Sequence, residues 1–321
     1  MKAVVLREYG PPENLKYEDF EAPQPTDGEV LVRVHAIGVN PIDWKIRSGA
    51  MKGLFSVAFP AILGYDIAGV VSGVGKGVTD FAAGDLVFAR TTGAYAEFAV
   101  AKAQELAKVP GELDLTMAAA LPVVTTTADQ LIREHAEVKA GQTILLTGVL
   151  GSVGRCALFC ALEQGAKVIA GVRAKQIGEA ESLGAARAID LSDDRSIAAL
   201  GPLDAVADTI GGALASKLLA QIKPGGIYAS VVGPPQDSAL HPQVRIKAFG
   251  SHADARAMVH YAEAIRDGKL TLPIDTVLPL AEASAAHQKG EKGGAGKIVL
   301  RAESLLLTLQ RAATGAGFSR F

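Results

Sequence analysis

Short runs of β-branched and other apolar residues, separated by Gly and Pro, fill the chain from residue 1 to about residue 121. The runs expected to form strands are 3–6, 29–36, 67–74, 85–89 and 94–100. Many short strands joined by glycine- and proline-containing turns are typical of barrel-like antiparallel sheets. This part of the sequence therefore predicts an all-β, barrel-like unit.

The pattern changes after Pro122, where apolar strand-like runs alternate with stretches of helical periodicity. Strands are expected at 143–147, 167–172, 186–190, 205–208 and 226–232, and helices at 153–164, 175–183 and 213–222. Alternating strands and helices with nearly continuous apolar strands are typical of a parallel, doubly wound sheet.

The C-terminal part of the chain predicts a helix at 253–267 and a last strand at 297–301, which we expect to pack back on the first unit. A length of 321 residues suits two domains. We therefore predict a substrate domain formed by 1–121 and 254–321, and a nucleotide-binding domain formed by 122–253. For residues 302–321 the pattern favours a short helix followed by disorder.

The amino-acid composition narrows the class of molecule on which the protein can act. The chain has 32 basic and 34 acidic residues, and no block of five like charges that would favour nucleic acid or a membrane surface. Two cysteines, Cys156 and Cys160, are too few for a disulfide framework, and the N-terminal stretch does not fit a signal peptide. These features predict a cytoplasmic protein that acts on a small molecule.

Three glycines at three-residue spacing, Gly148, Gly151 and Gly154, follow the strand expected at 143–147 and precede a helix. Glycines in this position allow a sharp turn, a close approach of a pyrophosphate to the backbone, and tight packing of helix on strand. The helix start at Ser152 and Val153 would present N–H groups to the anion. The pattern predicts a dinucleotide site, although a merely tight strand-to-helix turn would look similar.

The end of the next strand indicates which dinucleotide binds. An Asp or Glu expected there for the ribose of NAD is missing, and Arg173 and Lys175 stand in its place. Cationic side chains suit a 2′-phosphate, so the sequence favours NADPH over NADH, with solvated surface side chains as the alternative reading. Further contacts with the cofactor are expected from the strand ends at Asp208 and at Val231, Val232 and Gly233, mainly through backbone groups.

Several motifs, in order along nearly the whole chain, resemble one family. They are MKAVVLREYGPPENL at the start, GVNPIDWKIRSG from Gly38, PAILGYDIAGVV from Pro60, FAAGDLVF from Phe81, AAALP from Ala118 and GKIVL from Gly296. Together with the glycine turn they are similar to the medium-chain dehydrogenase/reductases, in their zinc-independent quinone oxidoreductase and enone reductase branch. The resemblance implies a GroES-like β-barrel catalytic domain, a Rossmann domain and a homodimer.

Zinc-dependent members of this family have a catalytic cysteine where this chain has Asn40, and a catalytic histidine where it has Tyr65. No cysteine precedes Cys156, and the six histidines show no metal-binding spacing. The sequence therefore predicts no metal. Without a Lewis acid, hydride addition to a quinone or to the C=C bond of an α,β-unsaturated carbonyl is favoured over alcohol dehydrogenation.

The resemblance also implies site residues. Asn40, Asp43 and Lys45 lie in the substrate-side motif, and Tyr65 occupies the position of the lost histidine, where its hydroxyl would face the reacting oxygen. Asn40 and Asp43 also suit a turn, and Tyr65 also suits a barrel core. On the cofactor side, the resemblance adds Thr127 near the nicotinamide and Lys297 in the last motif.

Two departures from the family pattern qualify this reading. Met51 stands where related reductases often have a tyrosine, and Leu191 where NADP-dependent relatives often have another. The predicted function is an NADPH-dependent reductase of quinones or enones. An enoyl-thioester reductase and a non-catalytic NADPH-binding protein, similar to lens-crystallin relatives, remain as alternatives.

Overall fold

The computed structural model describes residues 1–294 and 296–302, and the chain forms two compact units. Unit 1 contains Met1–Val123, Ala253–Arg266 and the chain from Ile274 onward, and unit 2 contains Val124–His252 and Asp267–Pro273. The helix and disorder expected at 302–321 lie, apart from Ala302, outside the described residues.

Unit 1 is built on β-strands, as the sequence predicts. Its larger sheet has the order β15-β16-β3-β5-β6-β8, with β7 pairing with β3, and a smaller sheet has the order β2-β1-β4. The strands are β1 (Lys2–Leu6), β2 (Leu15–Asp19), β3 (Glu29–Val39), β4 (Ala61–Ile62), β5 (Asp66–Val74), β6 (Leu86–Arg90), β7 (Phe98–Lys102), β8 (Leu106–Lys108), β15 (Ile274–Pro279) and β16 (Lys297–Arg301). Because β16 pairs antiparallel with β3, the end of the described chain completes the sheet of the first unit.

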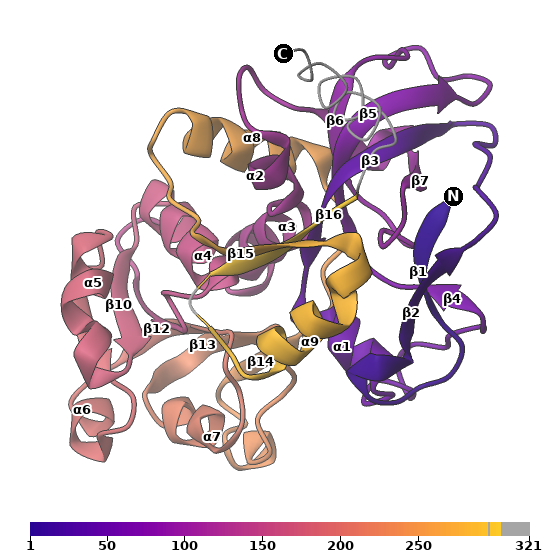
Figure 1. Cartoon of the computed structure of the whole chain (residues 1–321). Coiled ribbons are helices and arrows are strands. Elements are labelled where there is room, and N and C mark those ends of the chain that lie inside the picture. Colours follow the sequence, from indigo (N-terminus) through magenta and orange to yellow (C-terminus); the bar gives the residue numbers. More distant parts are fainter. Residues whose placement is uncertain (295, 303–321) are drawn as a thin grey trace, which may run out of the picture. The chain divides into compact units, whose positions relative to one another are not determined.

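Four α-helices of unit 1 border these strands: α1 (Pro41–Arg47), α2 (Leu115–Ala119), α8 (Ala255–Arg266) and α9 (Ala283–Glu291). Short 3₁₀ turns occur at Pro12–Asn14, Ala103–Glu105 and Leu280–Glu282. Helix α2 packs against β3 and β5, and α9 lies beside β15 and β16 (Figure 1). Helix α1 follows β3 directly, since Pro41 suits the first helical position and Asn40 precedes it in an extended conformation.

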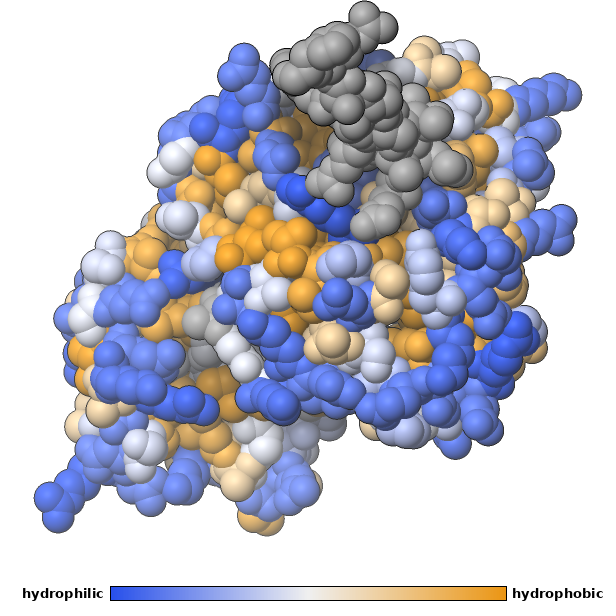
Figure 2. Space-filling view, in the orientation of Figure 1, coloured by the Kyte–Doolittle hydropathy of each residue, from blue (hydrophilic) through white to orange (hydrophobic). Residues whose placement is uncertain are grey.

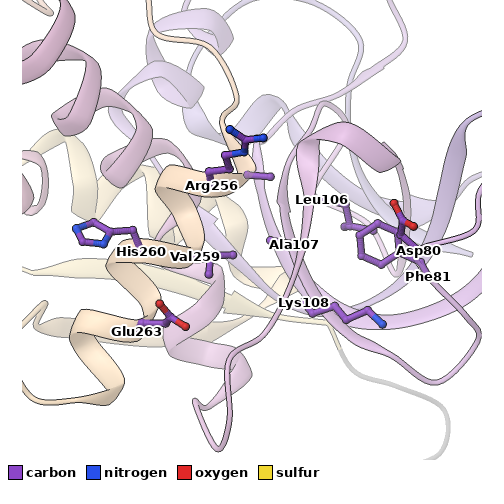
Figure 3. A pocket seen from close by; sticks show the side chains of 10 residues that line it. Asp80, Phe81, Leu106, Ala107, Lys108, Arg256, Val259, His260 and Glu263 are labelled. Carbon is purple, nitrogen blue, oxygen red and sulfur yellow. The ribbon is translucent and has the colours of Figure 1, made fainter.

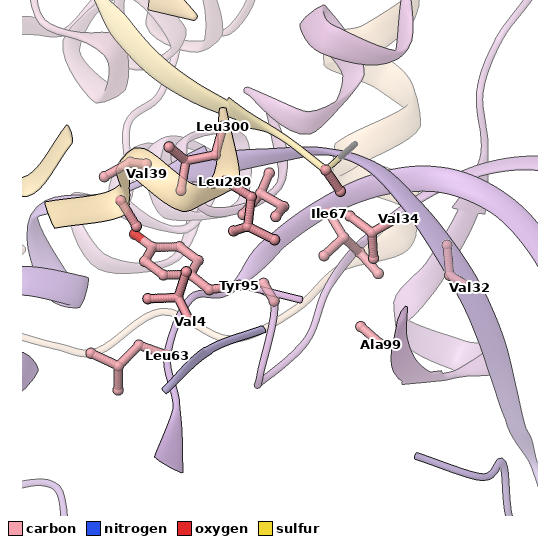
Figure 4. Close-up of a cluster of buried hydrophobic side chains, with 14 of the residues drawn as sticks. Val4, Val32, Val34, Val39, Leu63, Ile67, Tyr95, Ala99, Leu280 and Leu300 are labelled. Atoms are coloured by element: carbon pink, nitrogen blue, oxygen red, sulfur yellow. The ribbon is translucent and has the colours of Figure 1, made fainter. Parts of the chain in front are cut away.

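The core of unit 1 consists of apolar side chains and includes the polar hydroxyl group of Tyr95. Val4, Val34, Ile67 and Leu300 belong to a buried cluster drawn in Figure 4, and Tyr95 lies among them with a fully buried side chain. A buried tyrosine hydroxyl needs a hydrogen-bond partner, and this requirement fixes the polar groups placed next to it.

Unit 2 is a parallel sheet with the strand order β11-β10-β9-β12-β13-β14. The strands are β9 (Thr143–Thr147), β10 (Lys167–Val172), β11 (Arg187–Asp190), β12 (Leu203–Asp208), β13 (Ile222–Ser230) and β14 (Arg245–Ala248). The order reverses between β9 and β12. In open sheets of this kind, ligands bind beyond the carboxyl ends of the strands at the reversal.

The helices of unit 2 include α4 (Ser152–Glu163), α5 (Ile177–Ser182), α6 (Asp194–Ala198) and α7 (Ala213–Leu219), together with most of α3 (Pro122–Gln130), which a π-helical turn at Leu131–His135 continues. Shorter turns lie at Ala174–Gln176 and Ser238–Leu240. Helix α4 packs on β9 and β10, and α5 on β10 and β11.

Several sequence-based boundaries are wrong, and the strand expected at 94–100 lies instead at Phe98–Lys102. The helix expected at 213–222 ends at Leu219, and β13 already begins at Ile222, because Ile222 pairs with Leu203 of β12. The helix expected at 175–183 is divided into a 3₁₀ turn and α5.

On the face drawn in Figure 2, hydrophilic and hydrophobic residues are interleaved. No helix within the described part of the chain has both the length and the apolar character needed to cross a membrane.

Candidate cofactor and substrate site

The glycine turn connects β9 to α4 in unit 2. Gly148 has a φ of +67°, a conformation that favours glycine, and Gly151 is the N-cap of α4. A Cβ atom on Gly154 would collide with the carbonyl oxygen of Gly148, and one on Gly148 with the hydroxyl of Thr209. Gly148 and Gly154 are therefore required by the tight packing of the turn between β9 and α4.

Helix α4 begins at Ser152, and both Ser152 and Val153 are half-buried in its first turn. Its N-cap is a glycine, so no side chain caps the helix. The N–H groups of a helix start carry a partial positive charge, and a phosphate group is a suitable partner for them. This turn fits the pyrophosphate of a dinucleotide.

Asp208 connects the ends of three neighbouring strands. Its fully buried carboxylate accepts hydrogen bonds from Thr147 Oγ1 on β9 (2.8 Å) and Ser230 Oγ on β13 (2.9 Å). The backbone N–H groups of Ile210 and Gly211 also donate to it, each at 3.1 Å. Asp208 therefore fixes the strand ends relative to one another. The oxygens of its side chain already have hydrogen-bond partners within unit 2.

The residues after β13 present carbonyl oxygens and an apolar side chain. Val231 N donates to Asp208 O (3.2 Å), and Val232 N donates to Ser230 Oγ (3.2 Å), so the carbonyl groups are the backbone groups that suit a ligand here. Gly233 has a φ of +123°. Val232 after β13 and Ile210 after β12 are 41% and 50% exposed, which gives this edge of the sheet apolar surface for a flat ring.

Arg173 and Lys175 are both exposed and follow β10 directly. The backbone N–H of Arg173 donates to Gln176 Oε1 (3.1 Å), which fixes the turn that carries both cations. An acid does lie nearby: Asp190 ends β11 in register with Val172. Its carboxylate accepts from the backbone and hydroxyl of Ser192, which lowers its pKa. This acidic neighbour was not predicted from the sequence.

Thr127 is on α3 and is buried, with its hydroxyl 2.7 Å from Ser251 Oγ. The side chain of Gln130, one turn further on, exchanges two hydrogen bonds with the backbone of His252. These contacts fix the segment that follows β14 against α3 within unit 2.

In unit 1, Asn40, Asp66 and Lys297 form a buried triad. Asn40 Nδ2 donates to Asp66 Oδ2 (2.8 Å), and Lys297 Nζ donates to both Asn40 Oδ1 and Asp66 Oδ2 (3.2 Å). The other oxygen of Asp66 accepts from Val123 N (2.8 Å) at the start of α3. Lys297, expected to contact the cofactor, thus has its ammonium group within this triad.

Asp43, Tyr95 and His287 form a second buried group. The hydroxyl of Tyr95 lies 2.9 Å from both Asp43 Oδ2 and His287 Nε2, and Asp43 Oδ2 also accepts from Asn40 N (2.8 Å). Burial raises the pKa of Asp43 to about 7 and lowers the pKa of His287 to about 3, with the charge of Arg47 also lowering the latter. Asn40 joins this group to the triad.

Tyr65 and Lys45 differ from Asn40 and Asp43 in exposure. Tyr65 is half-buried, and burial together with the charge of Asp43 raises its pKa, while Arg90 lowers it. Lys45 is exposed on α1. Of the four residues predicted to be catalytic, Tyr65 and Lys45 thus have side chains that reach the surface of unit 1. Their roles, and those of Asn40 and Asp43, stay predictions.

An open pocket of about 510 Å³ lies elsewhere on unit 1, between β8 and α8 (Figure 3). The residues that line it are Asp80, Phe81, Leu106, Ala107, Lys108, Ala255, Arg256, Val259, His260 and Glu263. This lining contains no residue that the sequence predicts for the site.

Comparison with known proteins identifies the family. Residues 26–111 match the alcohol dehydrogenase GroES-like domain, and residues 183–300 match a family described as zinc-binding dehydrogenase. A quinone oxidoreductase from Lama guanicoe is 32% identical over 94% of this chain and 97% of its own length. The chain belongs to the quinone oxidoreductase branch of the medium-chain dehydrogenase/reductases. The GroES-like and Rossmann fold predicted from the sequence is confirmed.

Other relatives and solved structures agree with this membership. The quinone oxidoreductase of Pongo abelii is 40% identical over 172 residues, an alignment that spans about half of that relative's length (52%) and 53% of this chain. A 2-haloacrylate reductase from Burkholderia sp is 31% identical over 93% of this chain and 98% of its own. The structure of the Coxiella burnetii quinone oxidoreductase superposes with a TM-score of 0.85 at 28% identity, covering 94% of this chain and 99% of that one. Mycobacterial Rv1454c, solved with NADPH, gives a TM-score of 0.79 at 29% identity, covering 94% of this chain and 100% of that one.

The second matching family is described as zinc-binding, so the residues of this chain must be compared with the needs of a zinc site. Among residues 1–294 and 296–302, no three His, Cys, Asp or Glu side chains gather in a way that would hold a metal ion. Asn40 already binds Lys297 and Asp66, and an ammonium group beside it opposes a divalent cation. The residues at this position do not fit a catalytic zinc.

Several residues of the site were missed by sequence reasoning. Asp66 and Arg47 lie in motifs that carry the family resemblance but had no predicted role, and Tyr95 and His287 carried no local signal. Thr147 and Ser230 are strand-end residues whose hydroxyls both face an acid on the strand between them. A search for polar residues at the carboxyl ends of the expected strands would have found this last pair.

Proposed function

We propose that this oxidoreductase is a zinc-independent, NADPH-dependent reductase that adds hydride to a quinone or to the C=C bond of an α,β-unsaturated carbonyl. The observation that carries the proposal is the glycine turn at the start of α4, followed one strand further on by exposed Arg173 and Lys175. The NADPH bound to Rv1454c and the name of the 2-haloacrylate reductase support it.

Cofactor binding is assigned to unit 2. The first turn of α4 would hold the pyrophosphate, and Arg173 and Lys175 the 2′-phosphate, while the strand ends at Asp208 and Val231–Gly233 would lie along the rest of the molecule through backbone groups. Thr127 is proposed to lie near the nicotinamide. When bound, NADPH supplies the hydride for the reaction.

Tyr65 is proposed to donate a hydrogen bond to the substrate oxygen on which negative charge develops. Its hydroxyl keeps its proton at neutral pH, since burial raises its pKa, and it is therefore available as a donor. Lys45 is the alternative source of a proton on unit 1. Conjugation in a quinone or enone already spreads charge onto that oxygen, so a single hydrogen-bond donor gives useful stabilisation.

Asn40, Asp43 and Lys297 are proposed as positioning residues. Their polar groups are engaged with each other and with Asp66 and Tyr95 in the interior of unit 1, and they hold the start of α1 on the end of β3. In this role Lys297 acts through Asn40 and Asp66.

The test is a panel assay of NADPH oxidation with small quinones, alkenals, enones, acyl thioesters and simple aldehydes. Turnover with quinones or enones that is faster than with thioesters and aldehydes supports the proposal. Preference for an acyl thioester would instead identify an enoyl-thioester reductase, and tight NADPH binding without turnover a binding protein. Light scattering of the purified protein tests the homodimer, which we also propose.

A further inference from the structure

Arg155 is a buried arginine near the start of α4, three residues after Ser152. Only 7% of its surface is exposed, and its backbone N–H donates to the carbonyl oxygen of Gly151, the N-cap of the helix (2.9 Å). A cation at this end of a helix meets the positive end of the helix dipole, and a buried cation loses its hydration. Both effects disfavour an arginine here, so the contacts of its side chain have to compensate for them.

The side chain of Arg155 has partners in two different segments of unit 2. Its Nε donates to the carbonyl oxygen of Leu150 (3.3 Å), which lies between Gly148 and Gly151 in the glycine turn. Its Nη2 pairs with Oε1 of Glu179 on α5 (2.5 Å), and the side chain of Glu179 is 54% exposed. One guanidinium group therefore joins the glycine turn to α5.

Helix α5 directly follows the turn that carries the two cations proposed to bind the 2′-phosphate. Gln176 is the N-cap of α5, and its Oε1 accepts a hydrogen bond from the backbone N–H of Arg173 (3.1 Å). The backbone N–H of Gln176 in turn donates to Arg173 O (2.8 Å). The contact of Arg155 with α5 therefore continues, through the N-cap of this helix, to the backbone of Arg173.

These contacts join the two turns to which the phosphate groups of NADPH are assigned. We propose that Arg155, paired with Glu179, is a positioning residue that fixes the spacing between the glycine turn and the turn at Ala174–Gln176. NADPH places phosphate groups at both turns, whereas NADH has none at the second, so a fixed spacing favours NADPH alone. The inference rests on the proposed function, since it takes these turns as the sites of the pyrophosphate and the 2′-phosphate.

The test compares the dissociation constants of NADPH and NADH, measured by calorimetry, in Arg155→Met, in Glu179→Gln and in the double variant. Each single variant should lower the preference for NADPH over NADH about three- to five-fold, the size expected for a partly exposed ion pair. The double variant should lose no more than Arg155→Met alone, because the two side chains act through their contact. Arg133→Met is the matched control and should leave the preference unchanged, since Arg133 pairs with Glu163 at the other end of α4.

Two results would overturn the proposal. If Glu179→Gln increases the preference for NADPH, Glu179 competes with a phosphate group that Arg155 binds directly. If both single variants lower the free energy of unfolding in urea but leave the preference unchanged, the pair only stabilises unit 2. A wild-type protein without a preference for NADPH would refute the proposed cofactor and this inference with it, whereas a wild-type preference that survives both substitutions refutes only the role of the pair.

Discussion

Lys297 and Asp66 form an ion pair in the interior of unit 1, with Nζ and Oδ2 3.2 Å apart and side chains that are 3% and 0% exposed. The amide of Asn40 bonds to both partners. A buried ion pair adds little stability relative to apolar residues of the same shape, but the loss of one partner leaves an uncompensated charge in the interior. The pair is therefore sensitive to single substitutions.

We expect Lys297→Met to lower the free energy of unfolding by about 3 to 5 kcal/mol. The measurement is urea unfolding, with Lys16→Met as the control, since Lys16 is exposed. The double variant Lys297→Met with Asp66→Asn should lose much less than the sum of the two single variants. Additive losses would show that the two side chains do not stabilise each other.

Asp43 and His287 affect the pH dependence of stability in opposite directions. The pKa of Asp43 is raised to about 7, so the folded state binds this proton more tightly, and stability falls as pH rises from about 4 to about 7. The pKa of His287 is lowered to about 3, so the unfolded state binds its proton more tightly, and stability rises from about pH 3 to about 6.5. Between about pH 4 and 6.5 the two effects oppose each other.

Removing one of these two ionisable groups should reveal the effect of the other on the pH dependence of stability. Asp43→Asn should give stability that rises with pH in this window, and His287→Gln stability that falls, each by up to about 1.4 kcal/mol per pH unit. Urea unfolding across the window provides both slopes. Arg47, Glu291, Asp66 and Lys297, the other charged groups of this region, are unchanged in both variants. Slopes of the same sign in the two variants would contradict the opposition.

Arg173→Ala tests the choice of cofactor. A charge-assisted hydrogen bond to a phosphate is worth about 1.5 to 3 kcal/mol, so NADPH should bind about ten- to a hundred-fold more weakly and NADH nearly as before. Calorimetry gives both dissociation constants. Arg187→Ala is the matched control, because Arg187 is exposed at the amino end of β11, at the opposite end of the strands from Arg173. Equal losses for the two nucleotides would remove the assignment of Arg173 to the 2′-phosphate.

Tyr65→Phe tests the substrate side. Loss of a preorganised donor to a developing oxyanion costs about 2.7 to 4 kcal/mol, so kcat with an enone should fall about a hundred-fold or more while NADPH affinity is unchanged. Tyr17→Phe, on exposed strand β2, is the control. If Tyr65→Phe keeps about half of kcat, Tyr65 has a packing role only.

Dialysis against a chelator tests the absence of a metal requirement. Because Asn40 and Tyr65 replace the soft ligands of zinc-dependent relatives, activity should be unchanged and metal analysis should find no stoichiometric zinc. Inactivation that added zinc reverses would show that metal ligands lie elsewhere in the chain.

Much of the fold followed from local sequence patterns, because an apolar strand and an amphipathic helix differ in periodicity. β16 was predicted with its observed bounds, and the strands of unit 2 from β9 to β13 were expected within a few residues. β14 and β15 were not predicted. Their side chains are mostly half-buried or exposed, so the sequence shows no apolar run there.

The residues of the candidate site likewise divide into those that local sequence predicts and those that it does not. The glycine turn could be predicted, since its requirements are local in sequence. The contact between Tyr95 and His287 joins residues 192 positions apart, and neither residue has neighbours in sequence that indicate the other. Asp190 was missed for a related reason: it lies at the end of β11 and reaches the end of β10 only through the pairing of the two strands.

One carboxylate, that of Asp208, joins the ends of β9, β12 and β13 through side-chain and backbone hydrogen bonds. The loops that follow these strands therefore start from anchored positions. The loops can therefore differ in sequence while the strand ends stay in place, because the side chains that fix these ends, Thr147, Asp208 and Ser230, belong to the strands themselves.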